Sequence, residues 1–162
     1  MQPGRLTLAL ALLSLPLGAA PGCGNSGDAV RVTGKLVKGG ASYAPPAGQL
    51  VNVTLVGLGA AARPGTADPG GEPFWAEVDQ ARGTFSVPGR DGRGIPPGKY
   101  RVAVTRKRTR EAFEAAYPTP KKGVSREDDL LAGRFGLQTS AIVREIKSAS
   151  DLTVDLDRPG GE

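Results

Sequence analysis

The stretch GIPPGKYRVAV, residues 94–104, joins a turn signal to the start of a strand. Pro97-Gly98 suits the central pair of a type II turn, because proline fixes the first φ angle and glycine accepts the positive second one. Tyr100, Val102 and Val104 then alternate with Arg101 and Ala103, a pattern typical of a strand with one face in a core. A tyrosine at the start of such a strand can place its hydroxyl against a backbone group, as in a tyrosine corner. The stretch therefore predicts a turn followed by a core strand.

Six further segments have the same two-residue alternation of apolar and polar side chains. They are residues 29–38, 49–56, 74–79, 84–88, 141–147 and 151–157. Two pairs of neighbouring segments are hairpin candidates, one joined by residues 80–83 and the other by residues 148–150. Parallel strands would be apolar on both faces and joined by long helices. The sequence therefore predicts an all-β fold, a seven-stranded antiparallel β-sandwich over residues 29–157 with Ig-like architecture.

The composition agrees with this fold class. The 162 residues include 24 Gly and 14 Pro, an excess that argues against a helical bundle, a coiled coil or a doubly wound α/β fold. Helical signals are confined to a short excursion at residues 109–134. Residues 109–117 can form two turns before Pro118, and Ser125 with Asp128 resembles a capping box for a second short helix that ends at Gly133. An excursion of this length predicts either a contact surface, over residues 106–140, or a cover packed on the end of the sandwich.

The first 22 residues predict an export signal. A 12-residue apolar run at residues 6–17 is too short to span a membrane but suits the core of a signal peptide. Small residues precede Cys23, the single cysteine, so the site resembles a bacterial lipobox in which the thiol takes a diacylglycerol. The alternative is a secreted protein with a free thiol. We expect Cys23 to be the lipid attachment site, residues 23–28 to be a flexible tether, and residues 158–162 to be a disordered tail.

The sequence argues against an enzyme. It contains no histidine, so no His can activate a serine, and neither a histidine-based zinc site nor an intrachain disulfide can form. Two pairs of carboxylates, Glu77 with Asp79 and Asp155 with Asp157, are spaced to lie on the wet face of a strand. No acidic segment follows the spacing of a calcium-binding loop. We therefore expect no catalytic residue, no cofactor and no metal site.

One segment is strongly basic. Residues 99–126 carry nine Lys and Arg against two Glu, whereas the rest of the chain from Cys23 onward carries a formal charge of −3. Such a cluster can bind an anionic surface, either a lipid headgroup or an acidic glycan. Nucleic acid is not expected as a partner, because the chain is exported and few aromatic residues interrupt the cluster. The alternative is a solvated strand end. The candidate anion-binding residues are Arg106, Lys107, Arg108, Arg110, Lys121 and Lys122.

Trp75 is the candidate for a second kind of site. It alternates with inward-facing residues and lies beside Glu77 and Asp79 in the sequence, so an exposed indole there could stack on a sugar ring. The alternative is a tryptophan half-buried at a sheet edge.

Three segments together resemble a known family. Residues 94–100 are similar to the G-hydrophobic-x-P-G-x-Y signature of carboxypeptidase-regulatory-like domains, which have a transthyretin-like (prealbumin) sandwich. Residues 34–37, with the loop that follows them, resemble the V-x-G-x-V opening strand of that family, and residues 79–85 resemble its D-x-x-G-x-F hairpin with one extra residue. The mature chain also resembles small predicted lipoproteins of planctomycete bacteria, with Phe135 where a Tyr is usual. The resemblance implies a lipid-anchored, extracytoplasmic accessory module. We expect a non-catalytic binding or structural module of the cell envelope that faces the periplasm or the cell surface. From the basic segment we expect it to contact an anionic envelope polymer or another envelope protein.

Overall fold

The computed structural model describes residues 29–59 and 71–158. The predicted signal peptide (residues 1–22), the predicted anchor and tether (residues 23–28) and residues 159–162 of the predicted tail lie outside these ranges. Within the described ranges, no helix combines the length and the apolar character needed to cross a bilayer.

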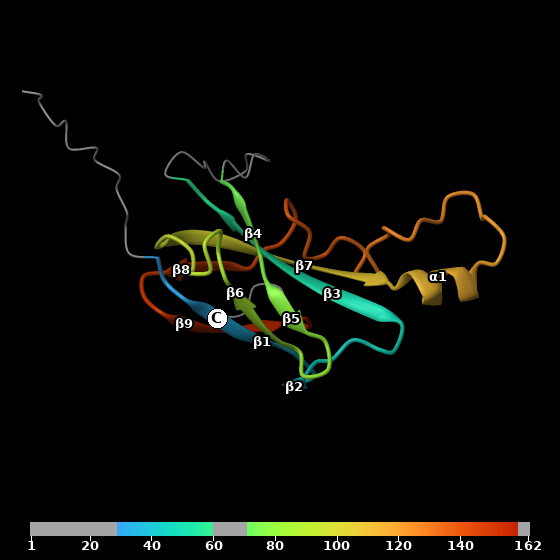
Figure 1. Ribbon diagram of the computed structural model, residues 1–162, viewed down its shortest axis with the longest axis horizontal. Helices are drawn as coiled ribbons and strands as arrows, with labels where there is room; N and C mark the ends of the chain where they lie inside the picture. The colour runs from blue at the N-terminus through green and yellow to red at the C-terminus, as the bar shows by residue number, and fades with distance from the viewer. Residues whose placement is uncertain (1–28, 60–70, 159–162) are drawn as a thin grey trace, which may run out of the picture.

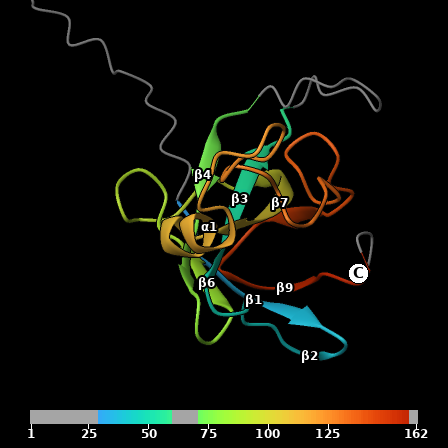
Figure 2. The same ribbon diagram turned by 90° about the vertical axis from the view of Figure 1, so that its right-hand side faces the viewer.

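Two β-sheets pack face to face around the core, which confirms the all-β two-sheet prediction (Figures 1 and 2). One sheet has the order β2-β1-β6-β5, with β9 on the other side of β1. The second sheet has the order β4-β3-β7-β8. The strands of the first sheet are β1 (Val32–Lys38), β2 (Ala41–Ser42), β5 (Glu77–Asp79), β6 (Thr84–Val87) and β9 (Ser150–Asp155). Those of the second are β3 (Gln49–Gly57), β4 (Pro73–Trp75), β7 (Gly98–Arg108) and β8 (Val143–Ile146).

The strand count and one pairing differ from the prediction. The described residues form nine strands, because the chain passes from β4 in one sheet to β5 in the other at Ala76, and because β2 adds a short pair to β1. The predicted hairpin around residues 80–83 is present as the β5–β6 pair. The second predicted hairpin is wrong: β8 pairs with β7, whereas β9 crosses to the first sheet and runs parallel to β1. Both strands still place buried side chains in the same core, Ile146 from β8 and Leu152 and Val154 from β9.

The tyrosine corner predicted at the start of β7 is present, but the type II turn is not. The Tyr100 hydroxyl donates a hydrogen bond to the Pro96 carbonyl at 2.5 Å, and burial raises the pKa of that hydroxyl. Gly98 does not take the positive φ angle of a type II turn, because it already pairs with Ile146 as the first residue of β7. The positive φ angle falls on Gly94 instead, at 112°.

Gly34 lets its neighbours on β6 and β9 pack closely against β1. It lies in β1 directly opposite Phe85 of β6 on one side and Leu152 of β9 on the other. A Cβ atom at Gly34 would lie 2.5 Å from the Leu152 carbonyl oxygen and would overlap the Phe85 ring. The absence of a side chain thus lets the Phe85 ring cover the β1 backbone inside the core. The fully buried members of that core are Leu36, Leu55, Ile95, Phe135, Ile142, Ile146, Val32, Val51, Val53, Val102, Val104 and Val154.

The excursion contains one helix rather than two. Helix α1 (Arg110–Ala116) begins after Thr109, whose side-chain oxygen accepts a hydrogen bond from the Ala112 N–H at 3.2 Å, and it ends before Pro118. The second predicted helix is wrong. The Asp128 carboxylate does accept from the Ser125 N–H at 2.8 Å, as a capping box requires, but only turns follow. The reason is that the Leu130 N–H donates to the Arg106 carbonyl of β7 at 2.7 Å, so this part of the chain pairs with the sheet instead of coiling.

Candidate functional site

The basic segment forms an arm that extends beyond the sandwich. We use this name for residues 106–128, which include the end of β7, α1 and the loop that follows it (Figure 1). All residues of α1 are described and none is buried, so the helix contributes nothing to the core. The helix is attached at Gly48, whose carbonyl accepts from the Thr109 N–H at 2.8 Å and whose missing side chain leaves room for the Ala112 methyl group. Viewed from its end, the arm projects toward the reader with α1 at its centre (Figure 2).

The rest of the excursion, residues 129–142, packs against the sandwich. The segment after the arm packs along the open edge of β7, where the Val104 N–H donates to the Phe135 carbonyl and the Val102 N–H to the Ile142 carbonyl. The Phe135 and Ile142 side chains are buried in the core. Residues 129–142 are therefore a packed cover, one of the two alternatives left open by the sequence, whereas a contact surface on the arm stays a prediction.

A groove of about 420 Å³ lies where the arm leaves the sheet. Its lining residues come from β3, from the end of β7, from Thr109 and the start of α1, and from the loop after α1. It is lined by Leu50, Asn52, Lys107, Arg108, Thr109, Arg110, Glu111, Arg126 and Glu127. Four cationic side chains face two carboxylates there, so the groove has a formal charge of +2.

The cations of the groove are held by exposed ion pairs. Lys107 and Arg126 both contact Glu127, at 2.6 and 3.0 Å, and Arg110 contacts Glu114 at 2.8 Å. The hydrogen bond from Lys107, followed by that from Arg126, holds the pKa of Glu127 below its usual value. Ion pairs this exposed contribute little to stability, so the cations remain able to exchange their carboxylate partners for an external anion.

Arg106 does not belong to the anion-binding site that the sequence predicted. Its side chain turns inward, where the guanidinium donates to the Tyr43 hydroxyl at 2.8 Å and to the Leu130 carbonyl at 3.2 Å. Its backbone N–H donates to the Asp129 carboxylate at 2.9 Å. Arg106 therefore joins the end of β7 to the packed cover and to the loop before β3, so its guanidinium is engaged within the protein.

The remaining predicted cations are distributed along the arm. Lys107, Arg108 and Arg110 line the groove, and the Arg108 guanidinium also lies 5.6 Å from the centre of the Tyr117 ring. Lys121 and Lys122 are exposed in the loop after α1 and have no ion pair within the described residues, but they do not line the groove. The predicted cluster is thus one groove with two further lysines outside it.

The candidate anion-binding residues predicted from the sequence do not include every residue that lines the groove. Arg126 was counted in the charge of the segment but was not singled out, and Leu50 and Asn52 come from a strand more than 50 residues earlier. Acidic residues that follow the basic segment also fold back onto it, as Glu127 does on Lys107. The signal that could have identified Glu127 and Arg126 was their adjacency, a carboxylate directly after the last cation of the segment.

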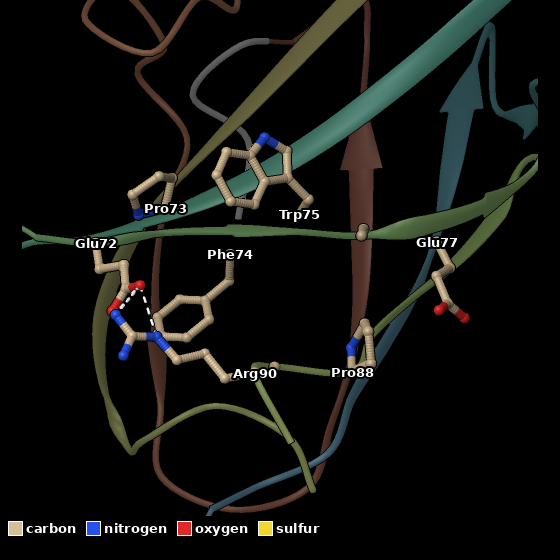
Figure 3. Close-up of a pocket in the computed structure, with 9 residues that line it drawn as sticks. Glu72, Pro73, Phe74, Trp75, Glu77, Pro88 and Arg90 are labelled. Atoms are coloured by element: carbon tan, nitrogen blue, oxygen red, sulfur yellow. Dashed lines mark hydrogen bonds and ion pairs between the residues drawn. The ribbon is translucent and has the colours of Figure 1, made fainter. Parts of the chain in front are cut away.

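Trp75 is exposed, as the sugar-stacking prediction requires, but its surroundings differ from those expected. The indole is 68% exposed at the edge strand β4. Trp75, Phe74 and the Glu72–Arg90 ion pair all line a pocket of about 400 Å³, with the indole on the opposite side of β4 from the Phe74 ring (Figure 3). Glu77 lines the same pocket, whereas Asp79 does not.

Three of the four paired carboxylates, Asp79, Asp155 and Asp157, accept structural hydrogen bonds. The Asp79 carboxylate closes the β5–β6 hairpin by accepting from the Ala81 and Arg82 N–H groups. The Asp157 carboxylate accepts from the Gly39 N–H at 2.5 Å, and the Asp155 carboxylate accepts from the Asp157 N–H at 2.8 Å. No group of three or more acidic, cysteine or histidine side chains that could hold a metal ion occurs in residues 29–59 and 71–158.

Comparisons of the chain with protein-family models, with curated proteins and with solved structures gave no match.

Proposed function

We propose that this chain is a lipid-anchored, extracytoplasmic protein that acts as a non-catalytic binding module of the cell envelope. In this proposal Cys23 carries the lipid, residues 23–28 form the tether, the sandwich is the scaffold, and the arm is the contact surface. The observation that carries the proposal is the arm itself. The helix buries none of its residues, so it contributes nothing to the core, and it lines a groove of charge +2; both observations support a contact with a partner outside the chain.

The finer assignment of the sandwich is part of the same proposal. We assign it to the transthyretin-like type of carboxypeptidase-regulatory-like domains, with Ig-like architecture. This is supported by the hydrogen bond of the Tyr100 corner and by the contact of Gly34 with Phe85, which joins two of the segments that resemble the family. Such a domain is an accessory module, consistent with a binding function.

The anchor is tested by replacing Cys23 with serine in the native host. Because a diacylated chain anchors stably and a polypeptide without it does not, the wild-type protein is expected in the membrane fraction and Cys23→Ser in the aqueous fraction or in uncleaved form. Resistance of the wild-type protein to release by high salt, and its release by detergent, completes the measurement. Equal release of both proteins by a salt wash would contradict the proposed anchor.

A second candidate function is accessory carbohydrate binding through Trp75, which its exposure favours. Because Trp75 is the only tryptophan, a sugar stacked on it should change the intrinsic fluorescence of the whole protein. Trp75→Ala is expected to weaken binding roughly tenfold and leave stability nearly unchanged, whereas Trp75→Phe should keep part of the affinity. A glycan screen in which Trp75→Ala binds every hit as well as the wild type does would eliminate this candidate.

A further inference from the structure

We propose that the groove of the arm binds an anionic polysaccharide located away from the membrane, rather than the headgroups of the bilayer that holds the anchor. The polymer is recognised by the carboxylate or sulfate groups along its chain. Binding of the polymer, the recognition step, depends only on the groove. The position of the groove away from the membrane, the orientation step, rests on the lipid anchor of the proposed function.

The cations of the groove suit a polymer better than a small anion. Arg108, Arg110 and Arg126 present planar guanidinium groups, which match carboxylate and sulfate oxygens in pairs. Glu127 and Glu114 already contact Lys107, Arg126 and Arg110, so a single free anion would have to displace a carboxylate that is held nearby. A polymer brings several charges at once, and each further contact forms at high effective concentration.

The positive surface continues beyond the groove. Lys121 and Lys122 are exposed in the loop that follows α1, and this loop forms the outer end of the arm (Figure 1). A linear polyanion lying in the groove could extend toward them, whereas a compact ligand would end at the groove. The two lysines therefore favour a chain-like ligand.

The aromatic residues of the arm argue for a polysaccharide over a single-stranded nucleic acid. Phe113 and Tyr117 pack against each other with ring centres 5.1 Å apart, and Arg108 lies over the Tyr117 ring. Both side chains are half-buried, so neither offers an open face for stacking a base.

The arm lies at the opposite end of the sandwich from the tethered end of the chain. The described chain begins at Ala29, and Val30 pairs with Ile95 just before β7 starts (Figure 1). Strand β7 then runs eight residues from Gly98 to the start of the arm at Arg106, about 27 Å at the usual rise per residue. A tether of residues 23–28 reaches about 20 Å when fully extended. When the sandwich stands on its tether, the groove is therefore several screening lengths from the headgroups, since that length is about 10 Å at 0.1 M salt.

The recognition step is tested with purified mature protein and three soluble polymers: polygalacturonate, dextran sulfate and uncharged dextran. We expect binding to the two polyanions, no binding to dextran, and a loss of affinity on the order of tenfold between 50 and 200 mM salt. The triple variant Arg108→Gln, Arg110→Gln, Arg126→Gln is expected to lose roughly tenfold or more. A control triple variant, Arg31→Gln, Lys35→Gln, Arg93→Gln, removes the same charge from exposed positions on the sandwich and should bind nearly as the wild type does. Equal losses in the two triple variants, or no loss in the first, would overturn the assignment of the groove.

The orientation step is tested with the lipidated protein in vesicles. Polyanion binding is measured at 0.1 M salt on neutral phosphatidylcholine vesicles and on vesicles that contain one third phosphatidylglycerol. A groove held away from the bilayer should bind the polymer within about twofold on both, because the acidic headgroups are screened at that distance. Loss of polymer binding on the acidic vesicles alone would show that the groove faces the headgroups and would overturn the proposal. Failure of the protein to insert into either vesicle would instead refute the anchor, and the polymer result in solution would still decide the groove.

Discussion

Gly34→Ala is expected to lower the free energy of unfolding by about 3 kcal/mol, at the upper end of the usual cost of overpacking a core. The added methyl group would lie 2.5 Å from the Leu152 carbonyl oxygen and would overlap the Phe85 ring. The ring can move, but the carbonyl is part of the β1–β9 ladder and cannot. Denaturant unfolding, followed by circular dichroism, measures the change.

Two further variants test whether the loss of stability comes from the contacts of the added methyl group. Gly59→Ala adds the same methyl group at a site with nothing within 4 Å and should change stability by less than about 0.5 kcal/mol. Adding Phe85→Leu to Gly34→Ala should recover none of the loss, because it relieves the ring contact, leaves the carbonyl contact and reduces buried apolar area. If Gly34→Ala unfolds at the same denaturant concentration as the wild-type protein, β1 is not enclosed between β6 and β9.

Phe135→Ala is expected to cost about 3–5 kcal/mol, the usual range for removing a fully buried aromatic ring. Phe135 is 1% exposed and is a member of the main core, although it lies in a segment without regular secondary structure. Its backbone carbonyl also pairs with the Val104 N–H of β7 at 2.8 Å. The loss should appear as a lower thermal midpoint and a faster digestion by protease.

Phe113→Ala is the matched comparison, because it removes the same ring from the other half of the excursion. Phe113 lies on α1 and is only half-buried, so its removal should cost about 1 kcal/mol. Equal costs for the two variants would contradict the division of the excursion into an arm and a packed cover.

The sequence predicted the two-sheet fold because alternation along single strands depends on local pattern alone. The inward residues of β1, β3, β6 and β7 are buried as that pattern requires. It did not predict the parallel pairing of β9 with β1, because hairpin signals report only neighbouring segments, whereas this pairing joins residues more than 110 positions apart. The missing second helix has a similar cause. The capping pattern at Ser125 is local, but the Leu130 N–H finds its partner on β7.

The sequence predicted only part of the candidate site, because contacts between distant segments also decide which side chains line the groove. A run of Lys and Arg in the sequence identifies positive charge but not the direction of each side chain. On β7, Arg106 turns inward to Tyr43 while Lys107 lines the groove, although the two residues are adjacent. Acidic residues after the basic segment neutralise part of its charge, since Glu127 contacts both Lys107 and Arg126. Which cations remain accessible is decided by contacts between distant segments, so the run alone could not define the groove.

The most direct measurement is the intact mass of the protein isolated from its native host. If the protein is tethered as proposed, its first residue will be Cys23, and fragmentation will place the mass of a diacylglyceryl group on that residue. A chain that starts at any other residue and carries an unmodified Cys23 thiol would contradict the account.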